Sequence, residues 1–285
     1  MSLSLLALQF INGIEYGLLL FLVASGLTLV FGVLGVLNFA HGSFYMLGAY
    51  LAWWIADRTG SVLLAALIGL PAMALLGYLA ERFAISRLYS RDHLSQVLFT
   101  YGLLLLFNEL QRTLFGNDVH GLTAPVSFSV KLGELQSFPG WRIVTAVCCL
   151  LVAFAMRWVI LGTRFGMRVR AGATNPEMIT ALGIDVRRLF SVLFTAGTVL
   201  AAFAGMLAAP LTTVYPGMGE GVLILSLVVV VIGGIGSIKG AFIGALMVGL
   251  ADTFGKVLLP SFSSAVVYAV MAAVLLFRPR GLLGV

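Results

Sequence analysis

The sequence carries very little charge. Only 10% of its 285 residues are Asp, Glu, Lys or Arg, whereas 61% are hydrophobic, and the mean hydropathy is +1.09. Soluble globular domains average about 25% charged residues. A soluble fold could not hide this much apolar surface, so we predict an integral membrane protein.

Cysteine and early positive charge are also scarce. The two cysteines, Cys148 and Cys149, are adjacent in an apolar run and lack any CxxC spacing, so we interpret them as packing or lipid-facing residues. No Lys or Arg precedes Arg58, so the apolar N-terminus lacks the basic region of a signal peptide. We expect this stretch to be the first membrane span.

Motifs of catalysis are missing as well. The sequence contains no HExxH, no GxSxG and no Walker-type GxxxxGK[ST], and His41, His93 and His120 have no spaced metal partners. We therefore expect no enzyme activity, no metal site and no cofactor in this chain. An ATP-driven function would need a nucleotide site on another protein.

Long apolar runs fill most of the chain. A spanning helix needs about 20 mostly apolar residues, and runs such as 63–79 and 222–235 do not alternate as barrel strands would. We predict an all-α, polytopic helical bundle of about eight to nine transmembrane helices, some short or broken, in a single domain over residues 1–285. The candidate spans are 10–36, 42–56, 61–83, 94–114, 142–161, 189–210, 222–238, 241–259 and 264–278.

Positive charge predicts the orientation of these spans. Alternating sides through the nine spans places 12 of the 17 Lys and Arg residues on one side. The positive-inside rule makes that side cytoplasmic, with the N-terminus outside and the C-terminus inside. The longest external connection is then 115–140, a lid or docking surface, and the longest cytoplasmic connection is 162–188.

The 162–188 loop contains more than a simple connection needs. Its first part is basic. Residues 171–188 have the composition of a helix that begins at Asn175-Pro176, because Asn is favoured as an N-cap and Pro at the first helical position. Gly183 would end this helix. One interpretation is an interfacial helix on anionic headgroups; the other is a contact with a partner protein.

Polar residues interrupt the apolar pattern at 35–42. Backbone groups exposed there need partners that lipid cannot supply, so the segment lies at the membrane edge or lines a protected cavity. Asn38 and His41 either cap the broken helix ends or line a substrate passage.

A weak internal repeat of this interruption occurs later in the sequence. Gly35, Gly42 and Phe44 recur at one constant offset as Gly233, Gly240 and Phe242. Broken helices in corresponding positions indicate a transport pathway, although small residues also permit simple helix packing. The candidate pathway residues are Asn38, His41, Gly42, Gly233, Gly234 and Gly236.

Ionisable residues within spans are costly and are functional candidates by default. Here they are Glu15, Glu109 and Asp252. Glu109 and Arg112 are three positions apart and could pair on one helix face, which is a structural role. The acids are too sparse to indicate a proton relay.

Three segments together resemble a known family. They are Asn38-Phe-Ala-His-Gly42, the stretch 170–184 (RAGATNPEMITALGI) and the stretch 233–240 (GGIGSIKG). In combination they resemble the membrane permease of branched-chain amino acid ABC importers, specifically the shorter of the two permease types, over nearly the whole chain.

The resemblance implies an importer in the bacterial inner membrane. Its partners would be a second, related permease, two cytoplasmic ATPase subunits that bind ATP and Mg²⁺, and an external substrate-binding protein. The loop would supply the coupling helix that sits on the ATPase, through Asn175, Glu177, Ala181, Leu182 and Gly183. Gly172, Ala173 and Thr174 stand where family members often have a charged residue, which puts individual contacts in doubt.

The substrate stays open at this point. Similar systems import branched-chain and other amino acids, urea, short amides and small carboxylates. From other classes, an ion-coupled secondary transporter would need no ATPase, and a purely structural membrane subunit would need no passage. Pairing with a different permease is favoured over pairing with a second copy.

Overall fold

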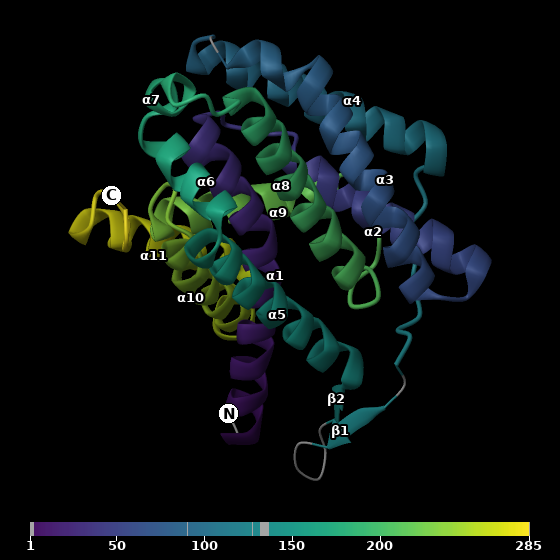
Figure 1. Ribbon diagram of the computed structural model, residues 1–285. Helices are drawn as coiled ribbons and strands as arrows, with labels where there is room; N and C mark the ends of the chain where they lie inside the picture. The colour runs from purple at the N-terminus through teal and green to yellow at the C-terminus, as the bar shows by residue number, and fades with distance from the viewer. Residues whose placement is uncertain (1–2, 90, 127, 132–136, 285) are drawn as a thin grey trace.

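The computed structural model describes residues 3–89, 91–126, 128–131 and 137–284. Within these residues the chain is almost entirely helical (Figure 1). The helices are α1 (Leu3–Leu34), α2 (His41–Thr59), α3 (Val62–Phe83), η1 (Ile85–Leu88), α4 (His93–Phe115), α5 (Gly140–Gly162), α6 (Arg164–Thr174), α7 (Pro176–Ala181), α8 (Val186–Ala208), α9 (Met218–Gly233), α10 (Ile238–Leu258), η2 (Pro260–Phe262) and α11 (Ser263–Phe277).

Short polar side chains begin several of these helices. Asp92 accepts a hydrogen bond from the Ser95 amide at 3.1 Å, and Asp185 accepts one from the Arg188 amide at 3.1 Å. Such caps satisfy amides that lack a partner in the first helical turn. The Ser95 hydroxyl and amide bonds lower the pKa of Asp92, so this cap stays ionised at neutral pH.

Each of the nine expected spans overlaps a helix, but the helices are not equally suited to crossing a bilayer. Within the described residues, six stretches are long and apolar enough: Leu5–Leu34, Val62–Leu88, Gly140–Gly162, Val186–Ala208, Ile238–Leu258 and Pro260–Phe277. The apolar helix α9 is shorter, and α2 and α4 fall outside the set because they carry more polar residues. The all-α bundle is confirmed in its main feature, while the count of eight to nine spans stays a prediction.

The connection 115–140, which we expect to be external, departs from the all-α prediction. It contains two short strands, β1 (Ser129–Lys131) and β2 (Ser137–Pro139), which pair antiparallel with Val130 opposite Phe138. Residues 127 and 132–136 of this connection lie outside the described part of the chain. Three-residue strands are too short for an alternation pattern to reveal, so the sequence did not predict them.

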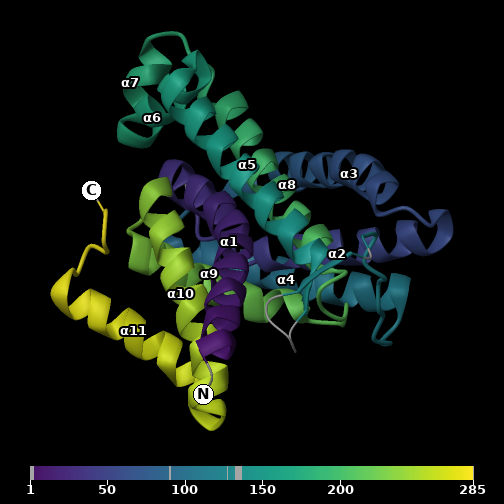
Figure 2. The same cartoon turned by 90° about the horizontal axis from the view of Figure 1, so that it is seen from below.

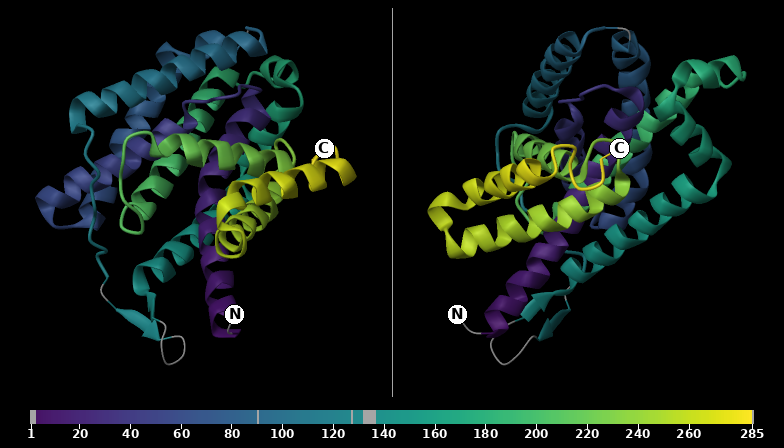
Figure 3. Two further views of the ribbon diagram at one scale, coloured as in Figure 1. Left: turned by 180° about the vertical axis from the view of Figure 1, so that it is seen from behind. Right: turned by 90° about the vertical axis from the view of Figure 1, so that its left-hand side faces the viewer.

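Helix α1 runs through the middle of the bundle (Figure 3). In the apolar 18-residue stretch of α1, 83% is buried by protein. In the corresponding stretch that contains α11, only 6% is buried. Glycines permit the tightest contact, because a Cβ on Gly249 of α10 would lie 2.4 Å from the Gly17 nitrogen of α1. Small residues let helices approach this closely inside a membrane.

The two ends of the bundle are clearly different. The N-terminus and the β hairpin lie at one end, and α6 and α7 project at the other (Figures 1 and 2). Arg142 at the start of α5 contacts Glu15 in the first half of α1, which agrees with the predicted alternation of spans. Which end faces the cytoplasm stays a prediction.

Candidate functional site

The first interruption is a short connection between α1 and α2. Gly35 takes a φ of +68°, a conformation that favours glycine, and turns the chain away from α1. Asn38 is 2% exposed, and its Oδ1 accepts a hydrogen bond from the Ala40 amide at 3.1 Å. The Thr100 hydroxyl of α4 donates to the Leu37 carbonyl at 3.1 Å. Asn38 Oδ1 and the Leu37 carbonyl therefore have protein partners, whereas Asn38 Nδ2 is buried with no hydrogen-bond partner among the described residues.

His41 shows where the interruption lies along α1. This side chain is fully buried, and its Nε2 lies 3.0 Å from the Val23 carbonyl oxygen. Val23 precedes the end of α1 by 11 residues, which is about 16 Å along a helix. Helix α2 therefore starts beside the second half of α1, well before the end of that helix, and its depth in the membrane stays a prediction.

Asn38 and His41 hold the interruption in place, and their role can be tested directly. We expect His41→Ala to lower the free energy of unfolding by about 1–3 kcal/mol, because a buried ring and its hydrogen bond to Val23 are lost. Thermal unfolding in detergent and substrate uptake would be measured on the same preparation. Uptake lost at wild-type stability would instead support a direct role in the passage.

Gly42 lies at a close crossing of α2 and α9. A Cβ on Gly42 would lie 2.3 Å from the Gly219 carbonyl oxygen, and one on Gly219 would lie 2.2 Å from the Gly42 carbonyl oxygen. No side chain fits at either position without separating the helices. Gly42 therefore contributes to helix packing, whether or not it also borders a passage.

The second interruption is a tight turn between α9 and α10. Gly234 and Gly236 take φ values of +93° and +79°. The C-terminal segment covers this turn, with the Leu282 amide donating to the Ile232 carbonyl at 2.8 Å and the Leu283 amide to the Gly233 carbonyl at 3.1 Å. The three glycines Gly233, Gly234 and Gly236 have different neighbours from Asn38, His41 and Gly42. The structure therefore does not bring these two groups of predicted pathway residues together.

Gly236 also borders a groove of about 550 Å³ between α5 and α10. Basic side chains at its rim are Arg157, Arg170 and Lys239. The passage role of Gly233, Gly234 and Gly236 stays a prediction.

A charged cavity lies at the opposite end, between α1, α5, α8 and α10. Its volume is about 320 Å³. Arg142 Nη1 lies 3.4 Å from Glu15 Oε2, and Lys256 Nζ lies 2.6 Å from Asp252 Oδ2. Glu15 is only 5% exposed, and its Oε1 has no hydrogen-bond partner in the part of the chain that the structure describes. The lining residues are Gln9, Asn12, Glu15, Tyr16, Leu19, Leu20, Val23, Tyr45, Arg142, Ala208, Leu211, Thr212, Val222, Asp252, Thr253, Lys256 and Val257.

The sequence indicated two members of this cavity but not the cavity itself. Glu15 and Asp252 are candidates because they are acids within apolar runs. Their association with Arg142 and Lys256 in one space depends on helix packing, since Glu15 and Arg142 are 127 positions apart. The only available signal was that both bases fall on the predicted external side.

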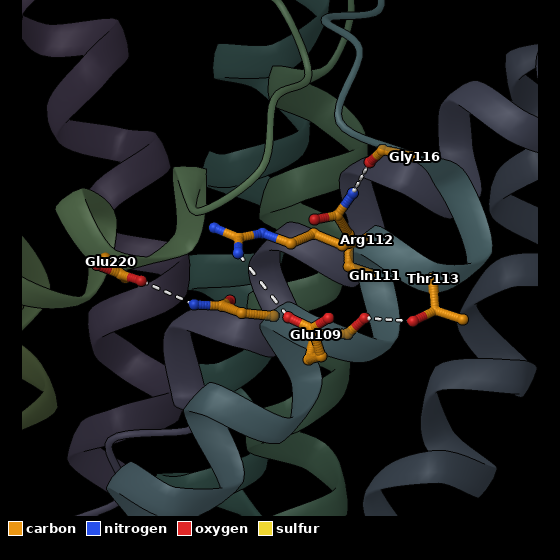
Figure 4. Close-up of polar contacts among 7 residues, drawn as sticks. Glu109, Gln111, Arg112, Thr113, Gly116 and Glu220 are labelled. Carbon is orange, nitrogen blue, oxygen red and sulfur yellow. Dashed lines mark hydrogen bonds and ion pairs between the residues drawn. The ribbon is translucent and has the colours of Figure 1, made fainter.

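Helix α4 carries the third predicted acid (Figure 4). Arg112 Nη1 lies 3.8 Å from Glu109 Oε2, with the two side chains 54% and 71% exposed. The predicted pairing is confirmed as an exposed pair within one helix. Beside it, Asn108 donates to Glu220 of α9 at 2.7 Å and links the two helices.

The 162–188 loop forms a projecting helical hairpin. Asn175 Oδ1 accepts a hydrogen bond from the Met178 amide at 2.9 Å, and Gly183 takes a φ of +81° just after α7. The predicted helix start and stop are thus confirmed. The sequence did not predict that the basic segment before it forms a separate helix, α6.

Helix α7 presents a free face. Ile179 is 3% exposed and anchors the helix, whereas Leu182 is 74% exposed. The remaining predicted coupling residues are exposed as well: Asn175, Glu177, Ala181 and Gly183. All five therefore lie where a partner could contact them.

A buried acid near this loop was not predicted. Glu81 of α3 is 1% exposed and accepts hydrogen bonds from the Tyr89 hydroxyl, at 2.7 Å, and from the Ser191 hydroxyl of α8. Burial, together with the bond to Glu81, raises the pKa of Tyr89 above its usual range. Tyr89 therefore stays a neutral donor to Glu81, and the Ser191 hydrogen bond to the same carboxylate ties the end of α3 to α8.

Comparison with known proteins shows similarity to membrane permeases along nearly the whole chain. A family model described as branched-chain amino acid transport system / permease component matches residues 9–277. The chain is 30% identical to the high-affinity branched-chain amino acid transport system permease protein BraD of Pseudomonas aeruginosa, over 97% of this chain and 95% of the relative. No solved structure matches.

Two relatives from Escherichia coli K12 extend this result. Identity to the permease protein LivH is 31% over 97% of this chain and 94% of the relative. Identity to LivM, a permease protein with the same high-affinity branched-chain description, is 24% over 92% of this chain and 67% of the relative. The chain is therefore a multi-pass membrane protein that belongs to the permease component family of branched-chain amino acid transport systems.

Proposed function

We propose that this chain is the permease subunit of an ATP-driven ABC importer in the bacterial inner membrane. Its substrate would be a small polar solute, foremost a branched-chain amino acid, moved by alternating access. The observation that carries the proposal is the near-full-length similarity to BraD and LivH, whose names state branched-chain amino acid transport.

The exposed face of α7 supports coupling to an ATPase. An apolar residue exposed on a short projecting helix is suited to a groove on a partner. A Cβ on Gly172 of α6 would lie 3.3 Å from both Ile179 of α7 and Leu189 of α8. Because α6, α7 and α8 pack this closely, a push on α7 would pass to α8 as a rigid-body movement.

The proposed assembly has partners on both sides of the membrane. Two cytoplasmic ATPase subunits would bind ATP and Mg²⁺ and contact α7. A second, related permease would complete the transmembrane part, and a periplasmic binding protein would deliver substrate at the end that carries the β hairpin. Two access states with different contacts are then required for transport.

Reconstitution tests this function. The chain would be purified with candidate permease, ATPase and binding-protein partners from the same genome, placed in liposomes and assayed for uptake of labelled leucine, isoleucine and valine. We expect uptake that requires ATP and binding protein and that stops when the Walker A lysine of the ATPase is replaced.

Other results would redirect the proposal. Uptake driven by an ion gradient without the ATPase would indicate a secondary transporter. Uptake of urea, short amides or small carboxylates in place of amino acids would leave the importer class intact and change its substrate.

A further inference from the structure

We propose that the charged cavity formed by α1, α5, α8 and α10 is a binding site for the ammonium and carboxylate groups of a zwitterionic amino acid. This inference rests on the proposed function and names the place in this chain where the substrate is recognised.

Both signs of charge meet in this cavity. Acids come from α1 and α10, and bases come from α5 and α10, in two pairs: Glu15 with Arg142, and Asp252 with Lys256. The two acids and two bases sum to zero charge. A zwitterion also has zero net charge, so it can exchange contacts with both pairs without leaving an uncompensated charge in the cavity.

The Glu15–Arg142 pair has unused hydrogen-bonding capacity. Glu15 is buried, its Oε1 has no partner among the described residues, and its other oxygen is 3.4 Å from Arg142. Arg142 directs the same Nη1 to Asn12 Oδ1 at 2.7 Å, although a guanidinium has five N–H donors. A buried carboxylate with a free oxygen suits an ammonium, and a guanidinium with spare donors suits a carboxylate.

The rest of the wall fits an aliphatic side chain. Leu19, Leu20 and Val23 of α1 and Val222 of α9 contribute apolar surface. The volume of about 320 Å³ lies at the lower end of small-molecule pockets, about 300–1,000 Å³. Urea or a short amide would leave the charged groups without counterparts and the apolar wall unfilled, so this cavity favours amino acids.

The cavity also reaches the middle of the bundle. Its lining on α1 runs from Gln9 to Val23, 14 positions or about 21 Å of helix. The carbonyl of Val23 is the one that His41 contacts. The cavity therefore extends along α1 from the end opposite α7 as far as Val23, the residue whose carbonyl His41 contacts.

Cysteine protection tests the site without relying on uptake. Thr253 lines the cavity and is half-buried. The two native cysteines would first be removed by Cys148→Ser and Cys149→Ala, and Thr253→Cys would then be introduced. The new cysteine would be labelled with a charged maleimide in the reconstituted importer. We expect saturating leucine to slow labelling about tenfold. Two analogues that keep the aliphatic part, 3-methylbutylamine without the carboxylate and 4-methylpentanoate without the ammonium, should protect little.

Charge-neutral variants identify the groups involved. Adding Glu15→Gln or Asp252→Asn should remove most of the protection, whereas Glu109→Gln, which removes an acid from the exposed α4 pair, should preserve it. Thermal unfolding would verify that each variant is folded. If Glu15→Gln does not assemble, Asp252→Asn and Lys256→Met, at the more exposed of the two ion pairs, carry the test.

The outcomes separate this inference from the proposed function. Leucine uptake without protection, or unchanged protection in the folded Glu15→Gln and Asp252→Asn variants, would overturn the site and leave the importer intact. Protection by leucine without ATP-dependent uptake would overturn the importer and support the site.

Discussion

The variant Leu182→Glu should lose ATP-dependent uptake about tenfold or more and still fold. Leu182 is 74% exposed just after α7, so a carboxylate there meets only water in the isolated permease. In the proposed complex, the same carboxylate would be buried unpaired against the ATPase, which costs several kcal/mol. Uptake and ATPase activity would be measured in the same liposomes, and permease stability by thermal unfolding.

A matched control lies in the same loop. Met167 of α6 is 54% exposed, so Met167→Glu places the same charge on a neighbouring helix. We expect the control to retain most uptake. Normal coupled uptake in Leu182→Glu would refute the assignment of α7 as the coupling helix.

The variant Gly219→Ala should destabilise the bundle by about 1–3 kcal/mol or more. Its new methyl group would lie 2.2 Å from the Gly42 carbonyl oxygen and 2.7 Å from the Gly42 carbonyl carbon. Backbone atoms cannot move aside as a flexible side chain can, so α2 and α9 must separate. The expected readout is a lower thermal unfolding temperature in detergent, with reduced yield.

Gly221 provides the control on the same helix. No atom lies within 4 Å of a Cβ built at Gly221, so Gly221→Ala should be neutral or slightly stabilising, since alanine is favoured over glycine in a helix by about 1 kcal/mol. Equal stability of the two variants would contradict the close α2–α9 crossing.

Much of the helical layout follows from local chemistry. Apolar run length located the main helices, and Asn175, Pro176 and Gly183 were sufficient to predict the start and end of α7, because capping depends on residues within one turn. The pairing of Glu109 with Arg112 was predictable for the same reason. The two short strands lacked such signals, whereas α6 has one that the prediction missed: the Thr163 hydroxyl caps its first turn by accepting a hydrogen bond from the Gly166 amide.

The candidate sites were only partly predictable. The interruption at 35–42 was evident, but its position along α1 was not, because the contact between His41 and Val23 requires the chain to return along α1. Likewise, the C-terminal segment that covers Gly233 and Gly234 comes from about 50 residues later in the chain, where no local rule applies.

By itself the sequence determined that this protein is a helical, multi-pass membrane protein of one permease family, since composition and local motifs suffice for that. Only the tertiary structure decided which charges share a cavity. Glu15, Arg142 and Asp252 lie on three separate helices, and charges on different helices meet only when close glycine contacts such as Gly17 with Gly249 fix how those helices cross.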